Sequence, residues 1–232
     1  MGQNGKVPLF LADEQALFRQ GLAHQLSLCP DMDVLGQAES DEEALAALEA
    51  LPPCVTILCS LSLTPFQNPV RKMHRRFPAG SILAVADVKD PEAIFEAASS
   101  GAEALLPRGT GAKGWAQTIR GVHRGGHPID LDLAEDHRVA RRFLREFQEL
   151  SSRPSLTSLL IHLSPMEQEI LRRLARGMPL EEISLSLQAT PRDLLRHITS
   201  IRRKLEANTF SQETALALWG DKDERKQKGA IC

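Results

Sequence analysis

The side chains best placed for chemistry lie between residues 190 and 205, where two kinds of residue alternate at helical spacing. The apolar set is Leu194, Ile198, Ile201 and Leu205. At about 100° per residue, a polar set points roughly the opposite way. That set is Arg192, Arg196, Thr199 and Arg203. Guanidinium groups on one edge of a helix can bind phosphates and base edges, and a helix about 24 Å long fits the major groove of DNA. The pattern therefore predicts a recognition helix.

Two helix starts with the same composition position this element. Residues 164–167 and residues 190–193 each place a hydroxyl cap, a proline and, three residues after the cap, a carboxylate. The missing N–H of proline is harmless in a first turn, and the hydroxyl and carboxylate can form a capping box. The sequence therefore predicts a helix from each start, with the second in the position of a recognition helix.

The first 127 residues alternate short apolar runs with helical patterns such as Leu17–Leu28 and Ala93–Ser99. The strand candidates are Val7–Ala12, Asp33–Ala38, Val55–Cys59, Ile82–Ala86 and Glu103–Leu106. Strands separated by helices of this length predict a doubly wound α/β fold with a five-stranded parallel sheet. Ligand chemistry in such a fold belongs at the carboxyl ends of the strands. The polar and thiol residues expected there are Asp13, Glu14, Cys59, Ser60 and Arg108.

Composition sets further limits on the class of protein. The chain has 232 residues and a formal net charge of -2, with 11 Lys or Arg against 15 Asp or Glu up to residue 130 and 17 against 15 after it. So slight a basic excess predicts weak non-specific DNA binding unless the chain dimerises or its cations are segregated on one face. No apolar run is long enough for a membrane span, and the four cysteines lack metal-ligand spacing. We expect a cytoplasmic protein with reduced thiols and no metal.

Two groups of residues resemble one known family. Residues 11–14, residues 17–22 and Gly101-Ala102 look like the receiver domain of a two-component response regulator. Residues 163–171, with Gly177, Glu182-Ile183, His197, Ile201 and residues 203–205, resemble the LuxR-type helix-turn-helix output domain of its FixJ/NarL branch. The resemblance covers nearly the whole chain. It implies a receiver-like, flavodoxin-like fold followed by a small all-α helix-turn-helix domain.

The resemblance also implies that the phosphorylation site is degenerate. In the family, an aspartate after the third strand accepts the phosphoryl group and binds Mg²⁺ together with acidic residues after the first strand. The residues at the family's site positions here are Asp13, Glu14, Cys59, Ala86 and Arg108, and Leu105 takes the place of an aromatic switch residue. A thiolate is a soft ligand, whereas Mg²⁺ prefers hard oxygens. We expect a receiver that does not take up phosphate, with Ser60 or Cys59 as the alternative acceptors.

Two further expectations concern the end of the sheet. An ion pair between Asp13 and Arg108 would hold the site in one state, because an unpaired carboxylate there would be costly to desolvate. Cys59 has two interpretations: a thiol of lowered pKa that senses redox state, or a small apolar residue of the core. Cys54 is on the same strand at an odd spacing, so the two thiols should face opposite sides of the sheet.

The output domain departs from the family pattern at Asp193 and Leu195, where threonine and lysine are usual. Asp193 would favour the helix start but repel DNA phosphates. By resemblance, Arg196 and Thr199 occupy base-reading positions, and Arg196 suits a bidentate contact with guanine. The candidates for backbone contacts are Thr190, Arg192, His197, Arg203 and Lys204.

The expected domain limits follow from these patterns. We expect a degenerate receiver domain over 1–127, a helical linker over 128–160, a LuxR-type helix-turn-helix domain over 161–220 and a charged tail over 221–232. Within the linker, an arginine-rich helix is predicted over Asp130–Ser152, and residues 151–158 are expected to form a joint. Its apolar stripe consists of Ala140, Phe143, Leu144 and Phe147, and would pack on the chain's own domains or form a dimer contact. A separate dimerisation helix is predicted over Ser211–Trp219.

The function that these observations predict is transcriptional regulation by an atypical response regulator, independent of aspartyl phosphorylation. The partners would be double-stranded DNA, a second copy of the chain, and a regulatory protein or small ligand at the degenerate receiver site. The rival is a protein-binding module that regulates another protein without binding DNA. No nucleophile paired with a base occurs, so we expect neither an enzyme nor a cofactor.

Overall fold

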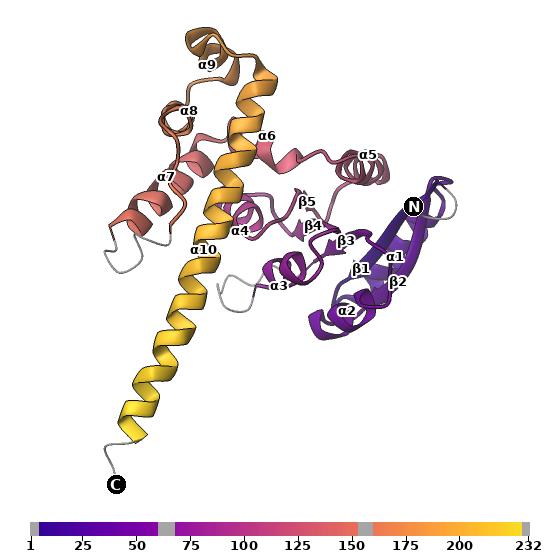
Figure 1. The fold of residues 1–232 in the computed structure, drawn as a ribbon. Coiled ribbons are helices and arrows are strands. Elements are labelled where there is room, and N and C mark those ends of the chain that lie inside the picture. Colours follow the sequence, from indigo (N-terminus) through magenta and orange to yellow (C-terminus); the bar gives the residue numbers. More distant parts are fainter. Residues whose placement is uncertain (1–4, 60–67, 153–159, 229–232) are drawn as a thin grey trace.

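Five parallel strands form the centre of the N-terminal part of the chain (Figure 1). The structure is a computed structural model that describes residues 5–59, 68–152 and 160–228, with side chains described as far as Ser211. The strands are β1 (Val7–Ala12), β2 (Met32–Ala38), β3 (Val55–Leu58), β4 (Ser81–Ala86) and β5 (Ala104–Pro107). Their order in the sheet is β2-β1-β3-β4-β5, with every neighbouring pair parallel. The predicted doubly wound sheet is confirmed.

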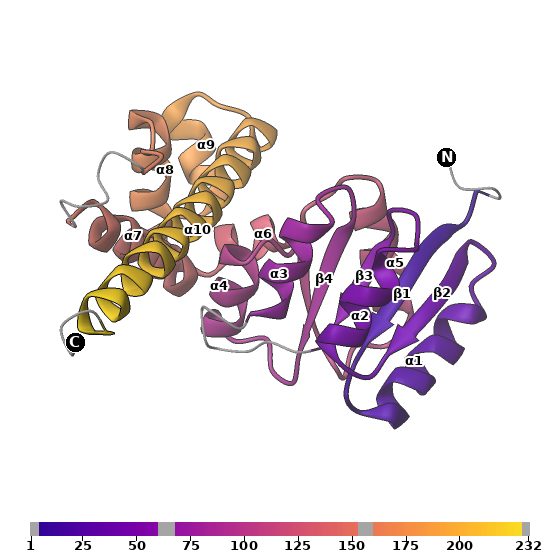
Figure 2. The same ribbon diagram turned by 60° about the horizontal axis from the view of Figure 1, so that its bottom comes forward.

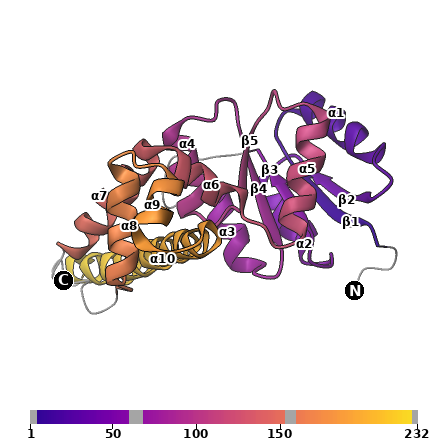
Figure 3. The ribbon, with the colours of Figure 1, turned by 90° about the horizontal axis from the view of Figure 1, so that it is seen from above.

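Helices cover both faces of this sheet (Figure 3). One face packs on α1 (Ala16–Ser27) and α5 (Ala112–His123), and the other on α2 (Asp41–Leu48), α3 (Pro69–Arg76) and α4 (Pro91–Ser99). Side chains alternate along each strand, so Leu9 joins the first face and Phe10 the second. Cys54 and Cys59 likewise pack on opposite faces, as their odd spacing predicts.

The linker forms two helices where the sequence predicted one. They are α6 (Pro128–Glu135) and α7 (His137–Ser151). Between them Asp136 is extended, with φ of -102° and ψ of 102°, and its carboxylate accepts a hydrogen bond from the backbone N–H of Arg138. Aspartate competes well for such caps, so it ends one helix and begins the next. The prediction of one helix over Asp130–Ser152 was wrong, and most of the joint predicted at 151–158 lies outside the described residues.

The apolar stripe of α7 packs within the chain. Phe143 is fully buried, and its ring meets Phe95 of α4 edge-on at a centroid distance of 5.2 Å. Arg142 lies over the Phe95 ring, 4.6 Å from its centroid. The same apolar cluster runs from the α2-α3-α4 face of the sheet through α6 and α7 into the C-terminal helices. The prediction that this stripe packs on the chain's own domains is confirmed.

Three helices complete the described chain: α8 (Pro165–Ala175), α9 (Leu180–Leu187) and α10 (Pro191–Lys228). The turn between α9 and α10 passes through Gln188, which has a left-handed φ of 51°. Figure 2 shows α10 beside α4 and α6, and it packs against both. This turn separates the 8-residue α9 from the start of α10.

The separate helix predicted over Ser211–Trp219 is instead part of α10, which continues through 221–228 into the expected tail. Residues 206–219 contain neither glycine nor proline, so nothing in that stretch ends a helix. Asn208 is buried inside the helix, and its amide accepts from the N–H of Ile161 at 2.7 Å and donates to the Ile161 carbonyl at 2.9 Å. It therefore joins α10 to the segment before α8 and does not cap a helix end.

Candidate nucleic-acid interface

The orientation of α10 is set by its apolar stripe and its first turn. All four predicted core side chains, Leu194, Ile198, Ile201 and Leu205, are fully buried. At the helix start, the backbone N–H of Asp193 donates to the Thr190 hydroxyl at 3.2 Å. The start of α8 is a full capping box between Ser164 and Glu167, as predicted. Burial of one face leaves the opposite edge of α10 directed outward.

Three of the predicted DNA-contacting arginines lie exposed on that edge: Arg192, Arg196 and Arg203. The side chain of Arg196 is 68% exposed and lies 3.4 Å from the Asp193 carboxylate, too far for a strong ion pair. Thr190 is exposed at the first turn, and His197 is half-buried beside the apolar stripe. The exposed edge can therefore donate to phosphates and bases along the first four turns of the helix.

Asp193 serves the helix start and remains ionised. Its carboxylate accepts a hydrogen bond from the Thr190 hydroxyl at 2.6 Å, and this bond lowers the pKa of Asp193 below its usual value. A carboxylate near the N-terminal end of a helix is favourable for the fold. The same negative charge is unfavourable for binding DNA phosphates. Asp193 therefore has both effects that the sequence predicted, a favourable one on the helix start and an unfavourable one on DNA binding.

Thr199 points toward protein, contrary to its predicted base-reading role. Its hydroxyl lies 2.5 Å from the carboxylate of Asp130 on α6 and 2.9 Å from the Leu195 carbonyl oxygen. The other carboxylate oxygen of Asp130 accepts from Arg202 at 2.8 Å, and both side chains are almost completely buried. The linker helix is thus joined to the middle of α10 through an ion pair and a hydroxyl. Sequence reasoning missed Asp130 and Arg202, because a contact across 72 residues leaves no local pattern.

Lys204 is likewise held inside the helical domain. Its ammonium group binds one carboxylate oxygen of Glu167 at 2.6 Å, and Ser200 donates to the other at 2.7 Å. Burial opposes ionisation of Glu167, but the bonds from Lys204, the Ser164 backbone and Ser200 outweigh it and lower the pKa to about 2. Lys204 therefore fixes α10 against the start of α8, and reaching a phosphate would require breaking this pair.

At the carboxyl end of the sheet, the predicted ion pair is present. A guanidinium nitrogen of Arg108 donates to the buried carboxylate of Asp13 at 2.5 Å. Arg108 also binds Asp87 at 2.9 Å and lies over the Phe18 ring, 4.7 Å from its centroid. Arg19 donates to the Asp13 carbonyl oxygen. The prediction that Asp13 and Arg108 pair is confirmed, and the guanidinium occupies the end of the sheet.

Cys59 is half-buried and packs against the apolar cluster on the α1-α5 face of the sheet. Burial raises the pKa of its thiol, and a hydrogen bond with Asp13 and the charge of that carboxylate raise it further. A thiolate is the reactive form, so these effects favour the interpretation as a small apolar residue over that as a redox sensor. Glu14 is exposed, Ala86 closes β4 without a hydroxyl, and Leu105 is buried in the core. Ser60 lies outside the described residues.

These groups do not fit a magnesium ion. Asp13 is committed to Arg108, and the residue after β3 offers a thiol where Mg²⁺ prefers oxygen. Within the described ranges no cluster of three or more His, Cys, Asp or Glu side chains could hold a metal. The guanidinium of Arg108 thus neutralises the Asp13 carboxylate at the carboxyl end of the sheet.

Comparison with known proteins bears on both parts of the chain. Residues 162–217 match the family described as "Bacterial regulatory proteins, luxR family". The C-terminal domain is a luxR-type helix-turn-helix.

The chain is 25% identical over 214 residues to the transcriptional regulatory protein LnrK of Bacillus subtilis, covering 89% of this chain and 94% of LnrK. It is 22% identical over 213 residues to the response regulator VraR of Staphylococcus aureus, covering 91% and 96%. A solved structure of Salmonella typhimurium RcsB is similar at 18% identity, with a TM-score of 0.48, covering 87% of this chain and 92% of RcsB.

In this luxR-type domain, α9 and α10 are the two helices joined by the turn, and α10 is the second. The structure leaves Arg192, Arg196 and Arg203 exposed on one edge of α10, and Thr190 exposed in the turn before it. Thr199 and Lys204 turn toward α6 and α8. None of the described helices is long and apolar enough to cross a membrane.

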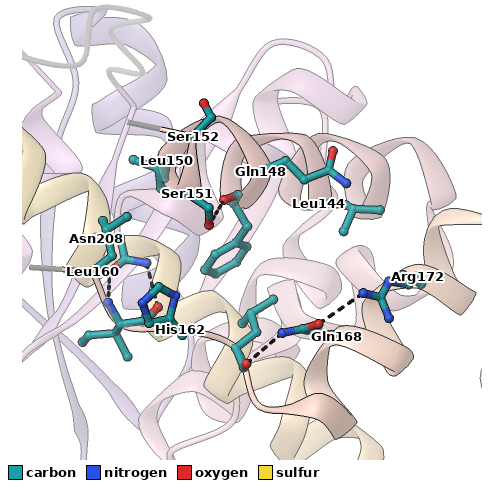
Figure 4. A pocket seen from close by; sticks show the side chains of 13 residues that line it. Leu144, Gln148, Leu150, Ser151, Ser152, Leu160, His162, Gln168, Arg172 and Asn208 are labelled. Atoms are coloured by element: carbon teal, nitrogen blue, oxygen red, sulfur yellow. Dashed lines mark hydrogen bonds between the residues drawn. The ribbon is translucent and has the colours of Figure 1, made fainter. Parts of the chain in front are cut away.

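A pocket of about 390 Å³ lies between α7 and the segment before α8 (Figure 4). Its walls carry Phe147 and Leu150 beside polar groups that bond mainly to one another. Gln168, for example, donates to the Leu163 carbonyl oxygen at 3.1 Å and accepts from Arg172 at 3.1 Å. Such internal pairing leaves few polar groups to select a ligand.

Proposed function

We propose that this chain is a DNA-binding transcriptional regulator that acts as a homodimer without aspartyl phosphorylation. The observation that carries the proposal is the exposed edge of Arg192, Arg196 and Arg203 on the second helix of a luxR-type domain, opposite a fully buried stripe. Arginine forks suit guanine edges and phosphates, and the helix fits the major groove. The similarity to LnrK, whose name describes a transcriptional regulatory protein, supports the same function.

The proposed mechanism assigns distinct contacts to the exposed edge. Arg196 would read a base, while Arg192, Arg203 and the Thr190 hydroxyl would contact the DNA backbone. Thr199 and Lys204 would join them only after leaving Asp130 and Glu167. Two copies of the chain would bind an inverted pair of half-sites in the cytoplasm. No catalytic step is part of the proposal.

Binding to random duplex DNA in a salt series tests the central claim. We expect affinity to fall steeply as salt rises, because each neutralised phosphate releases counterions. Fluorescence anisotropy with labelled duplex measures this, and sedimentation in the same buffers reports dimerisation. Absence of binding at low salt would contradict the proposal and favour the rival, a protein-binding module.

Independence from phosphorylation has its own support and its own test. Arg108 occupies the carboxyl end of the sheet, and Cys59 follows β3 where the family carries its acceptor. Incubation with acetyl phosphate and Mg²⁺ should leave the intact mass unchanged. A gain of one phosphoryl group would overturn this part of the proposal while leaving DNA binding untouched.

A further inference from the structure

A second site lies where α3 meets α10, in a cleft of about 400 Å³. We call it the interdomain cleft, and its charged and ring-bearing walls are Arg71, His74, Arg75, Glu103, His127, Arg202, Arg203, Glu206 and Phe210. Its two sides come from the receiver-like part and from the luxR-type domain. Figure 2 shows α3 and α4 facing α10 across this region. A ligand in the cleft would therefore contact both parts of the chain.

The lining of the cleft contains more arginines than glutamates. Four arginines and two glutamates line it, and one of these arginines, Arg202, is already paired with the buried Asp130. Both glutamates are already engaged: Glu206 binds His74 at 2.9 Å, and Glu103 accepts from the backbone N–H of Ile82 at 2.7 Å. Both carboxylates therefore have hydrogen-bond partners within the protein.

The cations at the rim remain accessible. Arg75 and Arg203 are exposed, from opposite sides of the cleft. Arg75 lies over the Phe210 ring, 3.8 Å from its centroid, and this contact helps to hold the guanidinium in place. Within the side chains described, Arg203 forms no ion pair. Two guanidinium groups facing one cleft are suited to bind a single anion of higher charge.

Two histidines, His74 and His127, line the inner wall of the cleft. The Nδ1 atoms of His74 and His127 are buried and form no hydrogen bond with any described residue. Buried polar atoms normally have partners, so two hydrogen-bonding positions of this wall are unused by the described residues. Burial lowers the pKa of His127, and the charges of Arg202 and Arg203 lower it further, against the opposing effect of Asp130. Arg202 and Arg203 thus both act as neighbouring positive charges on His127.

We propose that the interdomain cleft binds the phosphate group of a small phosphorylated molecule. A phosphate dianion matches two arginine forks better than a monovalent carboxylate does. The cleft holds a molecule of about mononucleotide size and is too small for a DNA duplex. By contacting Arg75 on α3 and Arg203 on α10, the ligand stabilises the packed arrangement of the two parts. It also withdraws Arg203 from the edge that faces DNA.

Calorimetry on the full chain, without DNA and at constant ionic strength, tests the site with inorganic phosphate and adenosine monophosphate as probes. We expect saturable binding of both, with roughly tenfold or greater weakening in Arg75→Ala and in Arg203→Ala, since each removes a charge-assisted contact. Arg176→Ala removes an exposed arginine outside the cleft and should leave binding unchanged. Circular dichroism confirms that each variant is folded.

A histidine readout locates the ligand. Bound phosphate should raise the pKa of His127 in a proton NMR titration, with the signal assigned by its loss in His127→Gln. Absence of saturable binding, or equal weakening in Arg176→Ala, would overturn the proposal. An Arg75→Ala variant that loses DNA affinity without any phosphate present would also overturn it, because the cleft would then serve the DNA backbone. Since the calorimetry contains no DNA, its outcome is independent of the proposed regulatory function.

Discussion

Replacing Asp130 with Asn should loosen α10 from the linker and strengthen DNA binding. Asp130 and Arg202 have side-chain exposures of 4% and 3% and are joined at 2.8 Å, so the substitution leaves a buried guanidinium without its main counter-charge. Breaking a buried ion pair by removing one partner costs about 3–5 kcal/mol. Glu103 also acts on Arg202 electrostatically, which places the expected cost near the lower end, about 3 kcal/mol.

That cost applies only while α6 and α10 remain packed. When α10 separates, Arg202 regains water and Thr199 is freed from Asp130, so the substitution shifts the equilibrium toward the separated arrangement. A shift of about 1.4 kcal/mol corresponds to a tenfold change in an equilibrium constant. We therefore expect Asp130→Asn to raise affinity for duplex DNA by about tenfold or more, and to lower the free energy of unfolding by about 2–3 kcal/mol.

Anisotropy with labelled duplex and urea unfolding measure the two effects. Asp132→Asn is the matched control, because Asp132 lies on the same helix but pairs with Lys89 at 2.6 Å and not with α10. The double variant Asp130→Asn with Arg202→Met should recover most of the lost stability, since it removes both charges. The reasoning is refuted if Asp130→Asn leaves DNA affinity unchanged and lowers the unfolding free energy by less than about 1 kcal/mol.

Three further predictions follow from the site. In the folded protein the pKa of Glu167 is lowered to about 2, from an unfolded value near 4.5. The stability that the ionised Glu167 contributes is therefore present above about pH 4.5 and is lost as the pH falls from there toward about 2. Urea unfolding across this range should show about 2 kcal/mol less acid sensitivity in Glu167→Gln, and an equal pH slope in both proteins would contradict the assignment. Arg196→Ala should lower affinity for a preferred DNA site by about 1–3 kcal/mol and broaden sequence choice, whereas Arg203→Ala should weaken binding to all DNA sequences alike and reduce the slope of log affinity against log salt by about one. A selection on randomised duplexes separates these outcomes, and equal effects of the two variants would refute the division of roles. Because the pKa of Cys59 is raised, peptide-level mass spectrometry at neutral pH should find it labelled by iodoacetamide far more slowly than a free thiol, and rapid selective labelling would count against the buried interpretation.

Features that depend on local periodicity could be predicted from the sequence. The five-stranded parallel sheet followed from alternating apolar runs and helices, and the buried stripe from Leu194 to Leu205 followed from spacing alone. The Ser164 capping box was also predictable, because its donors and acceptors lie within four residues. Each of these features depends on a pattern of residues that can be read along the sequence itself.

Long-range partners could not be predicted in the same way. Thr199 lies at a base-reading position by resemblance, yet a carboxylate 69 residues earlier accepts its hydrogen bond. Lys204 has the charge expected of a phosphate contact, but its ammonium group binds the carboxylate of Glu167. Asp13 and Arg108 were the exception, because the carboxyl ends of parallel strands must meet at one edge of the sheet. Topology predicted that pair, and no comparable rule linked α6 to α10.

The contact between His74 and Glu206 depends on the absence of a side chain at Gly101. This glycine has a left-handed φ of 96°, and a Cβ atom built there would lie 2.7 Å from the His74 ring and 3.1 Å from a carboxylate oxygen of Glu206. A neutral side chain at this position would displace the imidazole from Glu206 without changing the charge of either partner. The strength of the contact between the two parts of the chain can therefore be changed by a single substitution at residue 101. This position lies outside both the exposed edge of α10 and the carboxyl end of the sheet.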